Sequence, residues 1–119
     1  MGKTIAIDFD GTVVYDRVGP LLTENLKLNI QNVLRRLRKE GNILILYTCR
    51  VNECLEEALI FLQINRIKFD HINDNPFERI QKRKRSRKVY ADIYIDDRQL
   101  GGIPDDWEEI YKIIKEYDR

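Results

Sequence analysis

Two short segments of the chain are apolar at both odd and even positions, residues 4–9 (TIAIDF) and residues 42–48 (NILILYT). Strands with one face in water alternate between apolar and polar residues, so this pattern is typical of strands buried on both faces, as in a parallel sheet. Shorter strand-like segments follow at residues 69–72 and 93–95. These four segments constrain the fold more than any other feature of the chain.

Helical patterns lie between and after the predicted strands. Apolar residues recur at spacings of three and four over residues 22–37, where Thr23 is placed to cap a helix. A second helix is expected from Asn52 and a third after Asp106. This alternation predicts one α/β domain over residues 1–119, Rossmann-like, with a mostly parallel sheet of about four strands flanked by helices.

Composition excludes several classes of protein. Of the 119 residues, 43% are hydrophobic and 34% are charged, which is typical of a folded domain in water. The longest strongly apolar run, residues 43–47, is far shorter than the ~20 residues of a membrane span, so we expect no membrane partner. Cys49 and Cys54 are too few for a disulfide framework, and we interpret them as reduced thiols of a cytoplasmic protein.

Polar side chains follow all four predicted strands at the point where each strand ends. Parallel strands bring their carboxyl ends to one edge of the sheet, and open α/β sheets bind ligands beyond that edge. The residues expected to meet there are Asp8, Asp10, Thr48, Cys49, Arg50, Asn73, Asp74, Asn75, Asp96, Asp97 and Arg98.

Carboxylates packed at one edge repel each other, and a divalent cation relieves that repulsion. Oxygen ligands without His or Cys favour Mg²⁺, which takes its remaining ligands from water and substrate phosphate. Asp8 and Asp10 are two residues apart, so in an extended segment their side chains point the same way. One carboxylate can then attack phosphorus as a covalent nucleophile while its neighbour transfers protons.

Three motifs resemble those of the haloacid-dehalogenase (HAD) superfamily, whose members are mostly phosphatases. DFDGTV at residues 8–13 resembles the first motif, LYTCR at residues 46–50 the second, and YIDDR at residues 94–98 the fourth. The motifs occur in the family's order, and the resemblance extends along the whole chain. It implies a Mg²⁺-dependent phosphatase, a phosphoric monoester hydrolase that works through an aspartyl-phosphate.

The resemblance implies a role for each matched acidic residue. Asp8 would be the nucleophile and a metal ligand. Asp10 would be the general acid and base, and its backbone carbonyl would bind Mg²⁺. Asp96 would bind Mg²⁺, and Asp97 would bind it directly or through water.

The second motif would bind the substrate. Thr48 would hydrogen-bond a phosphate oxygen, and Cys49 and Arg50 would lie beside it in the substrate site. For Arg50, a substrate-binding role and a guanidinium that is simply exposed to solvent are equally compatible with the sequence.

The superfamily also uses a basic residue, usually Lys, to neutralise the phosphate, and we assign this role to Lys88. One extended strand from Lys88 to Asp96 would separate the two by roughly 25 Å, at about 3.3 Å per residue. Lys88 can therefore reach the site only if the chain reverses near residues 91–92. Lys82 or Lys84 could take its place.

Residues 82–88 (KRKRSRK) hold six basic residues in seven. The run is either a solvated surface or an electrostatic funnel for a large or polyanionic phosphorylated substrate, of which nucleic acid is one example. Family members insert cap domains at two points, and both segments are too short for a cap here. An open site suits a large substrate, or a homo-oligomer in which a neighbouring subunit lends a lid.

A second class of function is compatible with the same pocket. A non-enzymatic phospho-receiver, or a regulatory module, also uses an acidic Mg²⁺ site at a sheet edge, and a nucleic-acid-binding module would rest on the basic run. Receivers place their acidic pair early in the chain, whereas Asp96 and Asp97 come late. A receiver holds its phosphate, whereas Asp10 favours its release.

Overall fold

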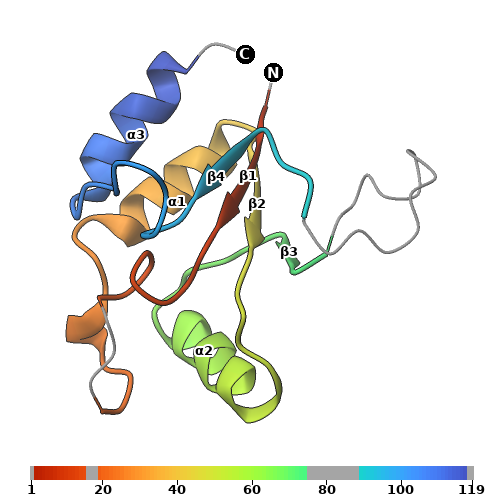
Figure 1. The fold of residues 1–119 in the computed structure, drawn as a ribbon, viewed down its shortest axis with the longest axis vertical. Helices are drawn as coiled ribbons and strands as arrows, with labels where there is room; N and C mark the ends of the chain where they lie inside the picture. The colour runs from red at the N-terminus through yellow and green to blue at the C-terminus, as the bar shows by residue number, and fades with distance from the viewer. Residues whose placement is uncertain (1, 16–18, 75–88, 118–119) are drawn as a thin grey trace.

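A four-stranded parallel sheet forms the centre of the computed structural model, which describes residues 2–15, 19–74 and 89–117 (Figure 1). The strands lie in the order β3-β2-β1-β4, and each neighbouring pair is parallel. Their bounds are Thr4–Ile7 for β1, Ile43–Leu46 for β2, His71–Ile72 for β3 and Ile93–Ile95 for β4. The α/β fold with a parallel sheet of four strands, predicted from the sequence, is confirmed.

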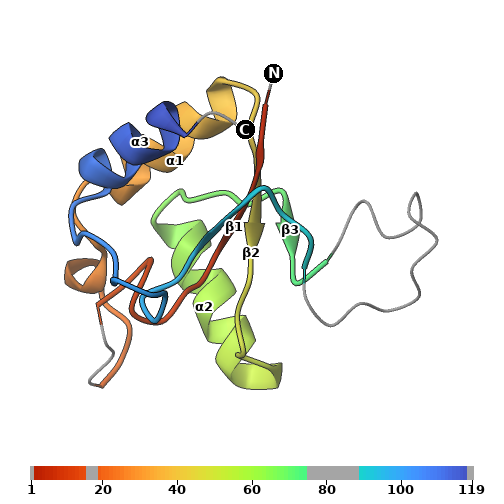
Figure 2. The same cartoon turned by 45° about the horizontal axis from the view of Figure 1, so that its top comes forward.

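Three helices cover one face of the sheet, as Figures 1 and 2 show. They are α1 (Ile30–Lys39), α2 (Asn52–Ile64) and α3 (Trp107–Glu116). Buried side chains of all three helices join Ile5 and Ile7 of β1 in one core cluster. On the opposite face, Ala6, Ile45 and Val89 form a smaller cluster. In the part of the chain that the structure describes, no helix is long and apolar enough to cross a membrane.

The register of the sheet aligns the carboxyl ends of its strands. Ile7 pairs with Leu46 on one side and with Ile95 on the other. Leu46 in turn pairs with Ile72. The ladder continues one residue further, since the backbone nitrogen of Asp8 donates to the backbone oxygen of Ile95 at 3.0 Å. The residues that follow the four strands therefore meet at one edge of the sheet, as predicted.

The first helix begins later than the sequence predicts. A single 3₁₀ turn, η1 (Thr23–Asn25), stands where the helix was expected to start, and α1 begins after Asn29, whose φ is 65°. Between them the chain pairs with the loop that follows β1, because the nitrogen of Lys27 donates to the oxygen of Val13 at 3.0 Å. This tertiary pairing replaces helical hydrogen bonds, and it leaves Leu22 half exposed although its spacing predicted a core position.

Candidate functional site

Three carboxylates lie together at the carboxyl edge of the sheet. Asp8 follows β1, and Asp96 and Asp97 follow β4. One oxygen of each lies within 4.8 Å of an oxygen of the other two, and all three side chains are half-buried. Oxygen donors at this spacing are the ligand set that Mg²⁺ prefers.

The charge of Asp8 is strongly perturbed in this cluster. Its pKa is raised to about 7, first by burial of the carboxyl group and next by the negative charge of Asp96. A hydrogen bond with the backbone of Phe9 opposes the shift, and the charges of Asp97 and Asp10 add to it. A divalent cation would relieve this repulsion. Both the negative charge and the oxygen ligands of the three carboxylates therefore fit the expected Mg²⁺ ion.

A cavity of about 350 Å³ opens at Asp8. The lining residues come from the ends of all four strands and from the segment before β4: Asp8, Tyr47, Thr48, Cys49, Asn73, Val89 and Asp96. The nitrogen of Thr48 donates to Asn73 Oδ1 at 2.9 Å, and its Oγ1 accepts from the nitrogen of Arg50 at 3.1 Å. Accepting this bond leaves the hydroxyl hydrogen of Thr48 available to an anion in the cavity.

Two larger cavities, of about 510 and 460 Å³, flank α2. Leucine, isoleucine and phenylalanine side chains contribute much of both linings, and three glutamates of α2 border the larger one. Neither cavity is lined by Asp8, Asp10, Thr48, Asp96 or Asp97. Each of the three motifs therefore contributes to the lining of the smaller cavity, through Asp8, Thr48 and Asp96, whereas the Asp10 and Asp97 side chains do not line it.

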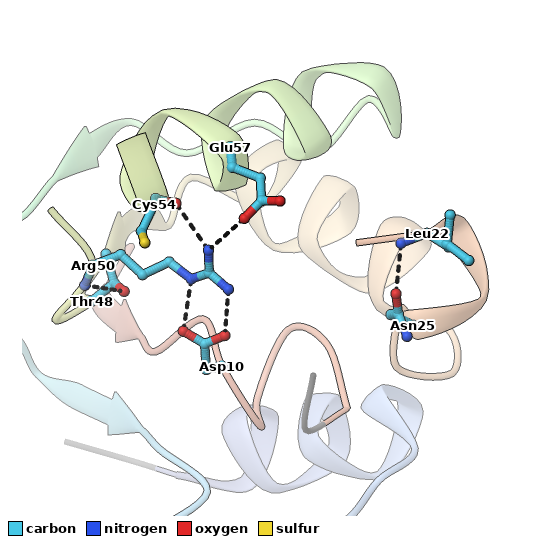
Figure 3. Close-up of polar contacts among 7 residues, drawn as sticks. All are labelled: Asp10, Leu22, Asn25, Thr48, Arg50, Cys54 and Glu57. Carbon is cyan, nitrogen blue, oxygen red and sulfur yellow. Dashed lines mark hydrogen bonds and ion pairs between the residues drawn. The ribbon is translucent and has the colours of Figure 1, made fainter. Parts of the chain in front are cut away.

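The side chain of Asp10 forms an ion pair with Arg50 (Figure 3). Arg50 Nε donates to Asp10 Oδ2, and Arg50 Nη2 donates to Asp10 Oδ1, both at 2.8 Å. Arg50 Nη1 donates to the backbone oxygen of Cys54 at 2.9 Å and to Glu57 Oε1 at 3.3 Å. The Arg50 side chain is 8% exposed, so little of it contacts solvent. Neither the pairing of Arg50 with Asp10 nor its contact with Glu57 was predicted from the sequence.

Thr12 was not singled out in the sequence, yet it connects the two acidic loops. Its hydroxyl accepts from the nitrogen of Asp97 at 2.9 Å, and its backbone oxygen accepts from Trp107 Nε1 at 3.1 Å. Gly11 makes the turn that precedes it with a φ of 83°, a conformation that favours glycine. The sequence signal that could have indicated this role is the threonine in the DFDGTV motif. If its hydroxyl is buried after the glycine turn, it needs a hydrogen-bond partner.

The chain reverses direction shortly before β4. Val89 lines the cavity that contains Asp8. Three residues later the chain has reached the amino end of β1, where Thr4 and Asp92 exchange two hydrogen bonds of 2.8 Å. The reversal that Lys88 requires is therefore present, although Lys88 itself lies outside the described residues.

Among the remaining residues expected at the edge, Asp74 is exposed. Cys49 lines the cavity, and its thiol is free and exposed. Arg98 is exposed, and its backbone nitrogen donates to Asp96 Oδ1 at 2.9 Å. Asn75 and the basic residues 82–88 lie outside the described part of the chain.

Comparison with known proteins finds a structural relative but gives no function for the chain. No family model and no curated protein matches the chain. The chain is similar to a solved structure of a conserved protein coded by a locus from Bacteroides thetaiotaomicron. The two are 38% identical with a TM-score of 0.84, over 100% of this chain and 94% of that chain.

Proposed function

The chain belongs to the same family as this conserved Bacteroides thetaiotaomicron protein, and we propose that it is a Mg²⁺-dependent phosphatase that hydrolyses phosphate monoesters through an aspartyl-phosphate on Asp8. The likeness of three motifs to the HAD superfamily supports the proposal. The observation that carries it is the position of Asp8. It directly follows a buried strand, lies in a cluster with Asp96 and Asp97, and lines a cavity together with Thr48.

Asp8, Asp96 and Asp97 would hold the metal ion, and the backbone carbonyl of Asp10 is a further expected ligand. When bound, Mg²⁺ supplies positive charge beside the phosphate oxygens. Lys88 is the proposed second source of positive charge, since Lys acts on phosphate as a point charge.

The two half-reactions use the chain's own carboxylates. First, an oxygen of Asp8 attacks phosphorus, the bond to the ester oxygen breaks, and Asp10 gives that oxygen a proton. Then a water molecule attacks the same phosphorus, Asp10 takes a proton from it, and the bond to Asp8 breaks to release inorganic phosphate. The hydroxyl of Thr48 would donate a hydrogen bond to a phosphate oxygen in both steps.

The substrate is proposed to be large or polyanionic. The two segments where family members insert caps are short in this chain, which favours an open site. The six basic residues within residues 82–88 would attract a polyanion.

A phosphatase screen tests the proposal. The purified protein should release phosphate from at least one of an aryl phosphate, nucleotides, sugar phosphates, phosphopeptides and phosphorylated DNA ends, with Mg²⁺ and not with chelator. Asp8→Asn should fold and be inactive, because an amide cannot form the aspartyl-phosphate. Glu53→Gln, which removes an exposed carboxylate of α2, should keep wild-type activity. Mg²⁺-dependent turnover by Asp8→Asn, or a folded wild type that turns over none of these substrates, would contradict the proposal.

A further inference from the structure

The resemblance of the three motifs assigns no role to the ion pair between Asp10 and Arg50. We propose that Arg50 is a positioning residue, which orients the carboxyl group of Asp10 for proton transfer and does not bind the substrate's phosphate. This inference rests on the proposed function, in which Asp10 is the general acid and base.

The geometry of the pair fixes the orientation of the Asp10 carboxyl group. Its two oxygens accept from two different nitrogens of Arg50, each at 2.8 Å (Figure 3). Two parallel hydrogen bonds of this kind hold a carboxylate in the plane of the guanidinium, whereas a single bond leaves it free to rotate. A proton donor must be aligned with the oxygen it protonates, so this restriction has a direct consequence for catalysis.

Arg50 is itself held by contacts with two other elements. The start of α2 accepts from its Nη1, through the backbone oxygen of Cys54 and the carboxylate of Glu57. On another side, the guanidinium carbon lies 5.0 Å from the centre of the Phe9 ring, which follows β1. The side chain is therefore a fixed support, and its position depends on packing within the core.

The same contacts leave Arg50 poorly suited to bind phosphate. A guanidinium has five N–H groups, and the four hydrogen bonds to Asp10, Cys54 and Glu57 use four of them. Recognition of a phosphate by Arg typically uses two parallel N–H groups, of which at most one is left. In addition, the carboxylates of Asp10 and Glu57 already offset the single positive charge of Arg50.

Exposure separates the roles of the two partners. The Asp10 side chain is 44% exposed and so open to a substrate, whereas Arg50 is 8% exposed. Arg50 and Thr48 both belong to the loop after β2, and the backbone nitrogen of Arg50 donates to the hydroxyl oxygen of Thr48. One loop would present a phosphate-binding hydroxyl and support the acid and base.

The dependence of the rate on the leaving group tests this assignment. A 4-nitrophenolate leaves phosphorus without a proton, whereas an alkoxide needs one, so a misplaced acid should affect only the alkyl ester strongly. The parameter to compare is kcat/KM, because it reports formation of the aspartyl-phosphate and not its hydrolysis. Arg50→Gln should lower kcat/KM by about 10- to 100-fold for an alkyl phosphate and by less than about 3-fold for 4-nitrophenyl phosphate, within the range of general acid catalysis.

A binding measurement gives a second readout that needs no turnover. In the inactive Asp8→Asn protein with Mg²⁺, adding Arg50→Gln should leave the calorimetric Kd for the alkyl phosphate unchanged within about threefold. Arg50→Lys keeps the charge but loses the paired donors, so it should show an intermediate loss that still depends on the leaving group. Arg35→Gln, which removes an exposed guanidinium of α1, is the matched control and should resemble the wild type. Thermal unfolding establishes whether each variant is folded. If Arg50→Gln does not fold, the comparison of the two esters is made with Arg50→Lys instead.

The outcomes separate this inference from the proposed function. Equal losses for both esters, together with a weaker Kd, would show that Arg50 binds phosphate and would overturn the assignment. Equal losses with an unchanged Kd would overturn it as well, because the proton-transfer role requires a difference between the esters. The alkyl phosphate in these assays is one that the wild type hydrolyses in the substrate screen. A wild type that turns over none of the screened substrates would overturn the proposed function, and the role of Arg50 would fall with it.

Discussion

Nε1 of Trp107 donates a hydrogen bond of 3.1 Å to the backbone oxygen of Thr12, and both residues are fully buried. Trp107 is the first residue of α3, so this bond connects the start of α3 to the loop that follows β1. The hydroxyl of Thr12 in turn accepts from the nitrogen of Asp97. Through Thr12, a helix that carries no part of the site helps to determine where the Asp97 carboxylate lies.

Trp107→Phe should destabilise the protein and weaken its metal site. Phenylalanine keeps much of the ring packing but cannot donate, which leaves the buried oxygen of Thr12 without this partner at a cost of about 1–3 kcal/mol. Mg²⁺ affinity should fall too, because the loop that carries Asp97 loses its support. Denaturant unfolding and calorimetric Mg²⁺ titration measure the two effects. Thr12→Ser, which retains the hydroxyl, is the control, and wild-type values for Trp107→Phe would contradict the prediction.

Asp8→Asn should stabilise the protein when no metal ion is present. At pH 8 in chelator, the wild type keeps an ionised Asp8 beside Asp96 and Asp97, whereas the amide carries no charge. The melting temperature of Asp8→Asn should therefore exceed that of the wild type by a few degrees in chelator. Excess Mg²⁺ should narrow or reverse this difference, since a ligand that binds the folded state stabilises it. A lower melting temperature for Asp8→Asn in chelator would show that repulsion among the three carboxylates does not control the stability of the ion-free protein.

The stability of the ion-free protein should depend on the protonation of Asp8. Its pKa in the folded protein is about 7, against an ordinary value of 3.8. Because the pKa of Asp8 is higher in the folded protein than in the unfolded chain, protonation of Asp8 favours the folded state. This contribution to stability is fully present below about pH 4 and is lost as the pH rises through 7. The wild type should therefore lose stability relative to Asp8→Asn between about pH 4 and pH 8, as followed by denaturant unfolding in chelator. A constant difference would contradict the raised pKa.

Mg²⁺ affinity should show the opposite dependence on pH. Below the pKa of Asp8 the ion must displace a proton, so the apparent affinity should rise about tenfold per pH unit up to about pH 7 and then level off. Calorimetry in buffers of different ionisation enthalpy measures both the affinity and the released proton. An affinity that is flat from pH 5 to pH 8 would mean that Asp8 is not a ligand.

Asp10→Asn should separate an enzyme from a phospho-receiver. Loss of proton transfer should lower kcat by about 10²- to 10⁴-fold, and phosphorylated protein should accumulate because its hydrolysis slows. Acid-quenched samples analysed by intact mass reveal the phosphorylated species. A wild type that stays phosphorylated for long periods and turns over no substrate would favour the receiver.

The basic residues should divide into two functional groups. Lys88→Met should reduce kcat at any salt concentration, because Lys88 is proposed to act at the phosphate. Neutralising Lys82, Arg83, Lys84 and Arg85 together should instead raise KM for polyanionic substrates, mainly at low salt, since exposed charges are screened beyond ~8 Å at physiological ionic strength. The four single variants of residues 82–85 are the comparison set. A salt-independent loss of kcat in Lys82→Met or Lys84→Met, with a normal Lys88→Met, would move the role to that lysine.

Local pattern and strand geometry were sufficient to predict the sheet and the residues at its edge. A strand buried on both faces is apolar at every position, so β1 and β2 are visible in the sequence without knowledge of their neighbours. Parallel strands in register end at the same edge, and therefore the placement of Asp8 and Asp96 side by side followed from topology alone.

The tertiary structure decided the features that depend on contacts between distant residues. Helical periodicity predicted a start at Thr23, but pairing of Lys27 with Val13 delays α1 to Ile30. Arg50, the partner of Asp10, is 40 residues away from it in the sequence, and Trp107, which donates to Thr12, is 95 residues away from Thr12. Hydrophobic periodicity records which face of an element is buried and says nothing of which polar atoms meet there, because such pairs form only after the elements have packed.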